Sequence, residues 1–421
     1  MTRSGPRSAP SAVSASAAAP RPVDADRRRL HRHLAPALLV TATALAGCSL
    51  FSTPTPPAVV APSLSPPGAL GYVVCPNAVT PVELATHTAE PDIRLPISGT
   101  PDLGNFAIAT SPDGRWAYVV TSDGVTPSPS TRRTLPPVTT GATGTTTEGT
   151  AVPTSGVSVQ NVVIPINLVT QQAEEPIKIP GQGGTHAIVV MPGGRTVLAA
   201  SGSTIVPVDA VTHQVGAPLD LGPGDTIFGL ALDPASTTLY ALVAGGVFPV
   251  DTATATAGAQ IPTRLSVSSV NSPHGIVVSG NGATVYVVGQ GGTDYGGRVL
   301  PIATATGAAQ PMTGFDKFGI SDPASIALDP TGTELLVADA ANNWVNPVSL
   351  ATFADPVDPV RLPPRAGTGH PTDIVFGPGN TGAFVVDGFS AVIPFQPGSQ
   401  MFGRPIGVCP GASSMAVARA P

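Results

Sequence analysis

The chain has 421 residues, of which only 11% are charged and 5% aromatic, and its formal net charge is −6. Its 47 Gly and 49 Pro, together with many Val and Thr, favour short strands and turns over helices. The hydrophobic fraction of 42% excludes a chain that is disordered as a whole. Beyond the N-terminal segment no Lys/Arg cluster interleaves with aromatics, so we expect no nucleic-acid partner.

Residues 1–47 have the layout of an export signal. A polar and basic stretch ends in Arg27-Arg28-Arg29, and the mostly apolar run Leu34–Ala46 follows it. This run of 13 residues is too short to span a bilayer, which takes about 20 residues. A basic region followed by a short apolar region is typical of an export signal.

The apolar run ends in Leu45-Ala46-Gly47-Cys48, which resembles the bacterial lipobox. The resemblance implies that Cys48 receives a lipid, becomes the first mature residue and anchors the protein on the extracytoplasmic face of the membrane. The alternative is an ordinary secretory signal in which Cys48 occurs by chance. The arginines also resemble a twin-arginine signal, which leaves the export route open. Residues 48–68 are rich in Pro, Ser and Thr and are expected to be an extended tether.

An internal repeat marks the rest of the chain. Each copy carries a Pro followed by an apolar residue at the end of a strand-like run, and in six copies a Thr follows shortly after. Asx and Thr side chains at a strand end start turns by bonding nearby backbone, so Asp209 and Asp251 are expected to form turns. The seven prolines are Pro81, Pro165, Pro207, Pro249, Pro301, Pro347 and Pro394.

Upstream of every copy but the first lie two apolar strands joined by a hairpin. In the clearest example, Ser111-Pro112-Asp113-Gly114 leads into Tyr118-Val119-Val120. Four strands every 40 to 50 residues or so are typical of a propeller blade. The example resembles the YVTN family of β-propeller repeats, which implies an all-β fold. We therefore predict a seven-bladed β-propeller over residues 69–421.

The predicted third strands depart from that family because each carries Pro in place of a residue with an N–H. Pro cannot donate to a ladder and belongs at an edge or a bulge. We therefore expect the fourth, outer strands beside these prolines to be short or irregular.

Six blades are complete, and the seventh is split between the two ends of the propeller. The segment 413–419 matches a first strand, whereas the segments 71–74 and 79–84 match a second and a third. Their pairing would close the ring and remove free edges. It would also place Cys75 beside Cys409, which predicts a disulfide in an exported protein. Two free thiols are the alternative.

Residues 123–160 form an insertion in blade one that is rich in Thr, Ser, Pro and Gly and has no apolar periodicity. We expect a disordered loop between the second and third strands. One interpretation is a site of O-glycosylation or partner contact, and the other is a tolerated insertion.

Histidine supplies the candidate catalytic residues. His186 and His274 each precede the apolar part of a first strand by two residues, and His370 does so by four. If first strands line the central channel, these residues from blades two, four and six would surround its mouth, where imidazoles bind metals or transfer protons. His370-Pro371 also resembles a His-Pro of lactonase-like propellers. The alternative is that the histidines cap strand starts, and Asp322 and Asp373 are candidate carboxylates with the same alternative.

Two functions fit these features. The first is a monomeric binding or scaffold module that recognises protein or glycan at the cell envelope. The second is a lactonase-like hydrolase that uses the three histidines. No nucleophile elbow, phosphate loop or metal-ligand spacing occurs in the sequence, so we expect no cofactor and favour the binding module. Fold alone cannot choose between them, because propellers host many functions.

Overall fold

The computed structural model describes most of the predicted propeller. The described residues are 68–97, 106–124, 159–181, 183–184, 187–222, 224, 226–266, 275–291, 296–310, 320–352, 358–364, 370–378 and 382–418. The predicted signal, Cys48 and most of the tether lie outside them. Residues 64–421 form one compact unit. Within the described ranges, no helix has the length and apolar character needed to cross a membrane.

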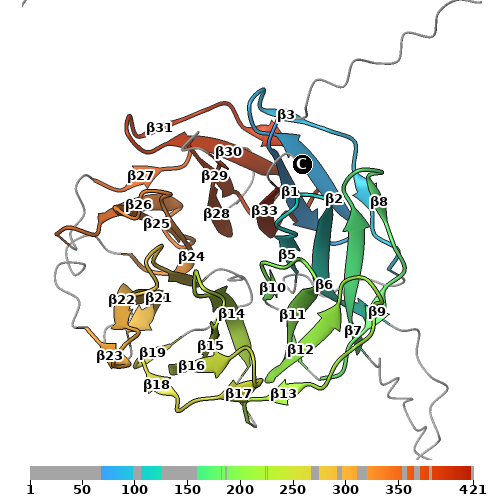
Figure 1. The fold of residues 1–421 in the computed structure, drawn as a ribbon. Helices are drawn as coiled ribbons and strands as arrows, with labels where there is room; N and C mark the ends of the chain where they lie inside the picture. The colour runs from blue at the N-terminus through green and yellow to red at the C-terminus, as the bar shows by residue number, and fades with distance from the viewer. Residues whose placement is uncertain are drawn as a thin grey trace, which may run out of the picture. The chain divides into compact units, whose positions relative to one another are not determined.

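The described strands form seven antiparallel sheets, which confirms the predicted all-β, seven-bladed propeller (Figure 1). Blade one contains β5 (Ala107–Thr110), β6 (Trp116–Gly124), β7 (Val159–Asn167), β8 (Gln172–Ala173) and β9 (Ile177–Lys178); blade two contains β10 (Ile188–Val190), β11 (Thr196–Ser201), β12 (Thr204–Asp209) and β13 (Leu219–Asp220); blade three contains β14 (Ile227–Leu232), β15 (Thr238–Val243), β16 (Gly246–Asp251), β17 (Thr256–Ala257) and β18 (Ile261–Pro262).

The remaining blades follow the same order. Blade four contains β19 (Leu265–Ser266), β20 (Ile276–Val278), β21 (Thr284–Gly291), β22 (Gly297–Ala303) and β23 (Ala308–Ala309); blade five contains β24 (Pro323–Leu328), β25 (Glu334–Asp339), β26 (Trp344–Ser349) and β27 (Val360–Arg361); blade six contains β28 (Asp373–Phe376), β29 (Ala383–Val386), β30 (Ala391–Gln396), β31 (Met401–Phe402) and β32 (Ile406–Gly407); blade seven contains β33 (Ser414–Ala418), β1 (Leu70–Cys75), β2 (Ala78–Glu83), β3 (Thr88–Ala89) and β4 (Ile93–Arg94).

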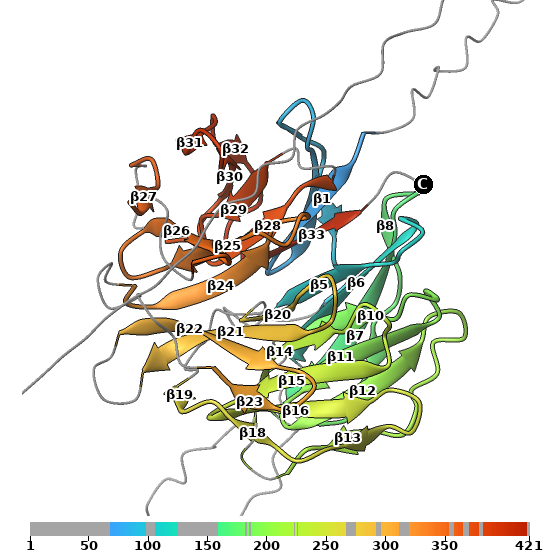
Figure 2. The ribbon, with the colours of Figure 1, turned by 60° about the vertical axis from the view of Figure 1, so that its left-hand side comes forward.

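The first strands lie innermost and contact one another in a closed circle. β33 contacts β5, and the contacts continue through β10, β14, β20, β24 and β28 back to β33. Figure 1 shows β5, β10, β28 and β33 around the middle of the ring. In the turned view of Figure 2, the four strands of blade two follow one another outward in the order β10, β11, β12 and β13.

The core consists of seven apolar clusters, one between each pair of neighbouring blades. Successive residues of a strand point to opposite faces of its sheet, so both faces of a blade are buried. In β6, for example, Val119 packs toward blade seven and Val120 packs toward blade two. This two-sided burial explains why the second strands are continuous apolar runs rather than alternating ones.

The ends of the propeller close blade seven as predicted. β1 pairs with β33 from Leu70↔Ala418 to Val74↔Ser414, and it pairs with β2 on its other side. Cys75 and Cys409 form a disulfide with their Cα atoms 6.0 Å apart. The bond lies in the apolar cluster between blades six and seven and joins residues 334 positions apart.

The prolines of the third strands direct their backbone toward the outer strands. In six blades the Pro carbonyl accepts an N–H from the fourth strand region, as in Glu90 N to Pro81 O at 2.8 Å. Since the N and C=O of one residue point to the same side of a strand, the missing N–H also faces outward. The fourth strand is broken there, for example into β3 and β4, which confirms the expectation of short, irregular outer strands.

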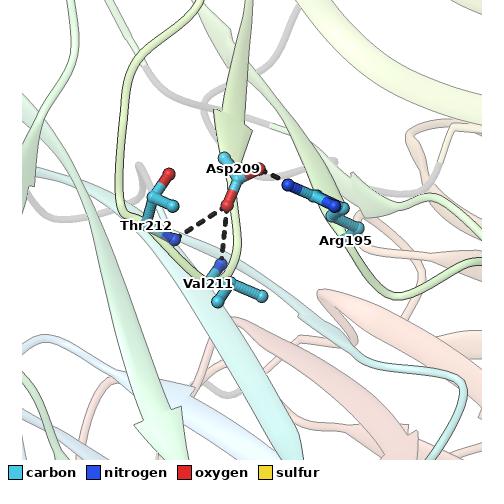
Figure 3. A network of polar contacts seen from close by, with 4 residues as sticks. All are labelled: Arg195, Asp209, Val211 and Thr212. Atoms are coloured by element: carbon cyan, nitrogen blue, oxygen red, sulfur yellow. Dashed lines mark hydrogen bonds and ion pairs between the residues drawn. The ribbon is translucent and has the colours of Figure 1, made fainter.

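The turns between third and fourth strands depend on Asx side chains, as expected for Asp209 and Asp251. Asp209 Oδ1 accepts the N–H groups of Val211 at 2.9 Å and Thr212 at 2.8 Å, and its Oδ2 accepts Arg195 Nε at 3.1 Å (Figure 3). The hydrogen bonds from the Thr212 and Val211 N–H groups and from Arg195 lower the pKa of Asp209. Asp251 Oδ1 accepts the N–H of Thr254 in the same way, and it also accepts the Thr254 hydroxyl at 2.8 Å, which explains the Thr at this position of the turn.

The residue after that Thr adopts a left-handed conformation. Its φ is 51° at Ala255, whereas blade four has glycine there, with φ 64° at Gly307. Left-handed backbone costs about 1–2 kcal/mol for a residue with a Cβ and nothing for glycine. Glycine is therefore the residue that fits this position of the turn best, and blade four has it whereas blade three has alanine.

We predict that Ala255→Gly raises the free energy of unfolding by about 0.5–1 kcal/mol, after allowing for the greater freedom of glycine in the unfolded chain. Ala255 is exposed, so no packing is lost. Gly307→Ala is the matched control and should lower stability by a similar amount. Denaturant unfolding measures both changes in the free energy of unfolding. Changes of the same sign in the two variants would contradict a cost of left-handed backbone at these positions.

Loss of the disulfide should destabilise the whole ring. Because the bond constrains a long loop in the unfolded chain, Cys75→Ala/Cys409→Ala should lower the free energy of unfolding by about 2–5 kcal/mol. Cys48→Ala removes a cysteine without touching the bond and should leave the unfolding midpoint unchanged. An unaltered midpoint in the double variant would show that strand pairing alone closes the ring.

Candidate functional site

The candidate residues lie on one face of the ring, which we call the starting face. It is the face at which the first strand of each blade begins, and antiparallel order places the hairpins between second and third strands there too. His370 is half-buried and lies three residues before β28. His186 and His274 lie outside the described residues, so the predicted ring of three histidines stays a prediction.

The base of the predicted insertion also lies on the starting face. β6 and β7 pair as far as Gly124↔Val159, so residues 123, 124, 159 and 160 belong to strands. Residues 125–158 lie outside the described part of the chain. Asn161 connects this base to blade two, since its Nδ2 donates to Ser201 Oγ at 2.8 Å and to Gly183 O at 3.0 Å.

Asp322 and His370 lie at the starts of the neighbouring blades five and six. Asp322 immediately precedes β24 and lies three residues before Ser325. His370 lies three residues before Asp373 of β28, which is the position that corresponds to Ser325, so Asp322 and His370 occupy corresponding positions. The strands β24 and β28 contact each other, so the two residues lie in neighbouring segments of this face. The Nε2 of Gln290 from blade four approaches Asp322 Oδ1 at 3.4 Å and donates to the Ser321 carbonyl at 3.2 Å.

The pKa of the Asp322 carboxyl is raised. Partial burial is the largest cause, and the neighbouring negative charge of Asp339 adds to it, whereas His370 and the Gln290 side chain act in the opposite direction. A partly buried carboxyl with a raised pKa can exchange a proton or hydrogen-bond a neutral ligand. His370 is the one histidine of the predicted three that lies among the described residues, and it shares this face with Asp322.

Asp339 fixes the backbone around Asp322. It is fully buried at the end of β25, and its carboxylate accepts the N–H of Ser321 at 3.0 Å, the N–H of Asp322 at 3.1 Å and Nδ2 of Asn342 at 2.8 Å. A buried carboxylate needs such donors to offset its desolvation. Asp339 therefore fixes the segment before β24 against the hairpin that follows β25.

Asp373, the second candidate carboxylate, links three first strands. It is fully buried, and it accepts the Ser325 hydroxyl of β24 at 2.8 Å and the Met415 N–H of β33 at 2.9 Å. It also accepts the N–H of Ile374 at 2.8 Å. These bonds join blades five, six and seven where their first strands begin, which assigns Asp373 a structural role.

A third carboxylate organises the hairpin between β29 and β30. One oxygen of Asp387 accepts the N–H groups of Phe389 at 3.0 Å, Ser390 at 2.9 Å and Ala391 at 2.8 Å. The Phe389 carbonyl accepts the Gly411 N–H at 2.6 Å. The hairpin is thus held from inside and from blade seven, while 54% of the Phe389 residue stays exposed.

The two tryptophans lie on different faces of the ring. Trp116 begins β6 on the opposite face and packs on the cluster between blades one and two. Trp344 begins β26 on the starting face, is half-buried and pairs with Asp339 and Arg361.

Sequence reasoning did not single out Gln290, Asp339, Asp387 or Phe389. A weak signal was present for two of them. Asp387-Gly388 after an apolar strand is a hairpin turn, and Phe389 is an apolar residue at its tip, where exposure is expected. Gln290 and Asp339 gave no such signal, because the contacts that place them at the site, with Ser321 and Asp322, come from another segment.

Among the described residues, no group of three or more His, Cys, Asp or Glu side chains lies close enough together to hold a metal ion. The metal hypothesis for His186 and His274 falls on residues outside that part of the chain.

No protein-family model matches the chain, and no curated protein matches it in sequence. Solved structures do resemble it. A hydrazine synthase structure from Kuenenia stuttgartiensis has a TM-score of 0.51 at 15% identity and covers 82% of this chain and 97% of its own. A protein of unknown function from Desulfotomaculum acetoxidans has a TM-score of 0.54 at 11% identity and covers 84% and 99%. The similarity is one of fold.

Asp322→Asn should stabilise the protein at neutral pH. A raised pKa means that the folded state binds the proton more tightly, so this carboxyl reduces stability as the pH rises above the ordinary value near 4. The variant and the wild type should therefore unfold alike at pH 3, and the variant should be the more stable at pH 7. Denaturant unfolding at both pH values measures the difference, and a variant that is less stable at pH 7 would contradict the sign.

Proposed function

We propose that this chain is an exported lipoprotein whose propeller binds a protein or a glycan at the cell envelope through its starting face. The lipobox-like Leu45-Ala46-Gly47-Cys48 at the end of a short apolar run supports the anchor. The Pro-rich residues 48–68 supply the spacer that lets an anchored domain reach its partner.

The observation that carries the binding role is the preorganisation of the starting face. Three carboxylates accept backbone N–H groups there and so fix the backbone. They belong to Asp339, Asp373 and Asp387. The side chains that project beyond them, such as Phe389, are therefore held before any partner arrives. A surface ordered in advance loses little entropy on association.

A photo-crosslinking experiment tests this assignment. A photoreactive amino acid at exposed Ala341, in the hairpin between β25 and β26, should give covalent adducts in intact cells. The matched control is exposed Val211, in the turn between β12 and β13 on the opposite face. Adducts from Ala341 but not from Val211 are expected, and the absence of adducts at Ala341 would refute a binding role for the starting face.

The anchor has a separate test. Cells supplied with an alkyne-tagged palmitate should label the wild-type chain, and the label should be lost in Cys48→Ala. The variant should also move from the membrane fraction to the soluble fraction. Membrane retention of an unlabelled Cys48→Ala chain would overturn the lipid anchor.

One observation favours a second candidate, a lactonase-like hydrolase. Asp322, whose pKa is raised by burial, and His370 lie at corresponding positions before the neighbouring strands β24 and β28, and carboxyl and imidazole groups are the side chains that most often transfer protons. In a screen of lactones, hydrolysis by the wild type that falls at least tenfold in His370→Ala and Asp322→Asn would establish this function. Equal rates in wild type and both variants would exclude the pair from catalysis.

A further inference from the structure

Phe389 is an unusual residue on the starting face. Of the large apolar residues that are exposed in the described ranges, it alone lies on this face. The others, Val169, Val211, Val215 and Met401, lie in or beside the turns and outer strands that follow the third strands. Leaving an aromatic side chain in water forgoes a burial free energy of about 1.5–3 kcal/mol.

The Phe389 backbone is clamped on two sides. Asp387 accepts three consecutive N–H groups of the hairpin, and the Phe389 and Ser390 carbonyls accept the Gly411 and Val408 N–H groups at 2.6 and 2.9 Å. Residues 408–411 are themselves fixed by the Cys75–Cys409 disulfide. An exposed aromatic on a fixed backbone is the arrangement that binding surfaces use for their anchors, because little conformational freedom is lost when it is covered.

The hairpin that carries Phe389 packs against the segment that carries His370. The Gly388 backbone, at φ 68°, approaches the segment before β28 so closely that a Cβ there would lie 2.7 Å from the His370 carbonyl oxygen. His370 precedes β28 as Asp322 precedes β24, and these two first strands contact each other where blades five and six meet and lie side by side in Figure 1. Phe389, His370 and Asp322 thus lie in neighbouring segments of this part of the starting face.

This composition fits a sugar better than a protein. The core of a protein interface needs several apolar side chains, and the described residues of this face expose one. A pyranose ring has an apolar C–H face that stacks on an aromatic ring, and its hydroxyl groups bond imidazole and carboxyl side chains. The Asp322 carboxylate repels polyanions, which favours an uncharged sugar chain.

We propose that Phe389, His370 and Asp322 form a subsite for a neutral polysaccharide, with a sugar ring stacked on Phe389 and its hydroxyls bonded to His370 and Asp322. The proposal rests on the binding function proposed above and names its ligand class.

Affinity electrophoresis of the full-length protein tests the subsite. Native gels contain dextran, mannan or arabinogalactan, and a gel with polygalacturonate serves as the charged control. The wild type should be retarded by at least one neutral polysaccharide and not by polygalacturonate. Phe389→Ala should weaken the apparent affinity at least tenfold, His370→Ala and Asp322→Asn should weaken it measurably, and Phe389→Trp should retain it.

Two controls separate binding from folding. Met401 is 65% exposed on an outer strand, so Met401→Ala should migrate like the wild type. Because the Phe389 side chain is exposed, Phe389→Ala should keep the wild-type unfolding midpoint. In Phe389→Trp, the added indole should shift its fluorescence when the retarding polysaccharide is titrated in.

The outcomes distinguish this proposal from the broader one. Retardation that survives in Phe389→Ala, or retardation by polygalacturonate alone, would overturn the subsite and leave glycan binding in place. No retardation by any neutral polysaccharide, with a protein adduct at Ala341 in cells, would overturn the sugar assignment and keep the binding module. Failure of both experiments would overturn both proposals.

Discussion

The pairing of β1 with β33 is the constraint on which the rest of the structure depends. Each blade buries both faces of its sheet against neighbours, and the seven apolar clusters exist only because the ring is complete. If blade seven opened, blades one and six would each expose an apolar face, and β1 would present a free edge. The disulfide beside this pairing reinforces the point of the ring that no continuous chain crosses.

The closure also shapes the starting face. The segment that carries Cys409 into β33 donates N–H groups to the hairpin that holds Phe389, and Asp373 accepts the Met415 N–H at the start of β33. The candidate surface on blades five and six is therefore continuous with the closure of the ring. Stability and recognition use the same segment, because the strand that completes the ring begins on the face where the candidate groups lie.

The two faces of the ring differ in regularity. On the face opposite the candidate site, Asx side chains and a left-handed residue repeat the same turn in several blades, as at Asp209 and Asp251. On the starting face, Asp339, Asp373 and Asp387 each form a different set of bonds. Turns that only reverse the chain stay alike from blade to blade, whereas the irregular face carries the features that distinguish one blade from another.

The sequence by itself determined the number of blades and the split blade, and it favoured the Cys75–Cys409 disulfide over two free thiols. These features follow from local patterns, since each Pro-marked strand and its hairpin lie within one repeat, and antiparallel order then fixes which strand ends meet. The tertiary structure alone decided that Gln290 of blade four approaches Asp322, that the Asp339 carboxylate accepts the backbone N–H groups before β24, and that Phe389 stays exposed. Those contacts join residues from separate blades or hairpins, and the irregular connections between blades, rather than the repeat, set their positions.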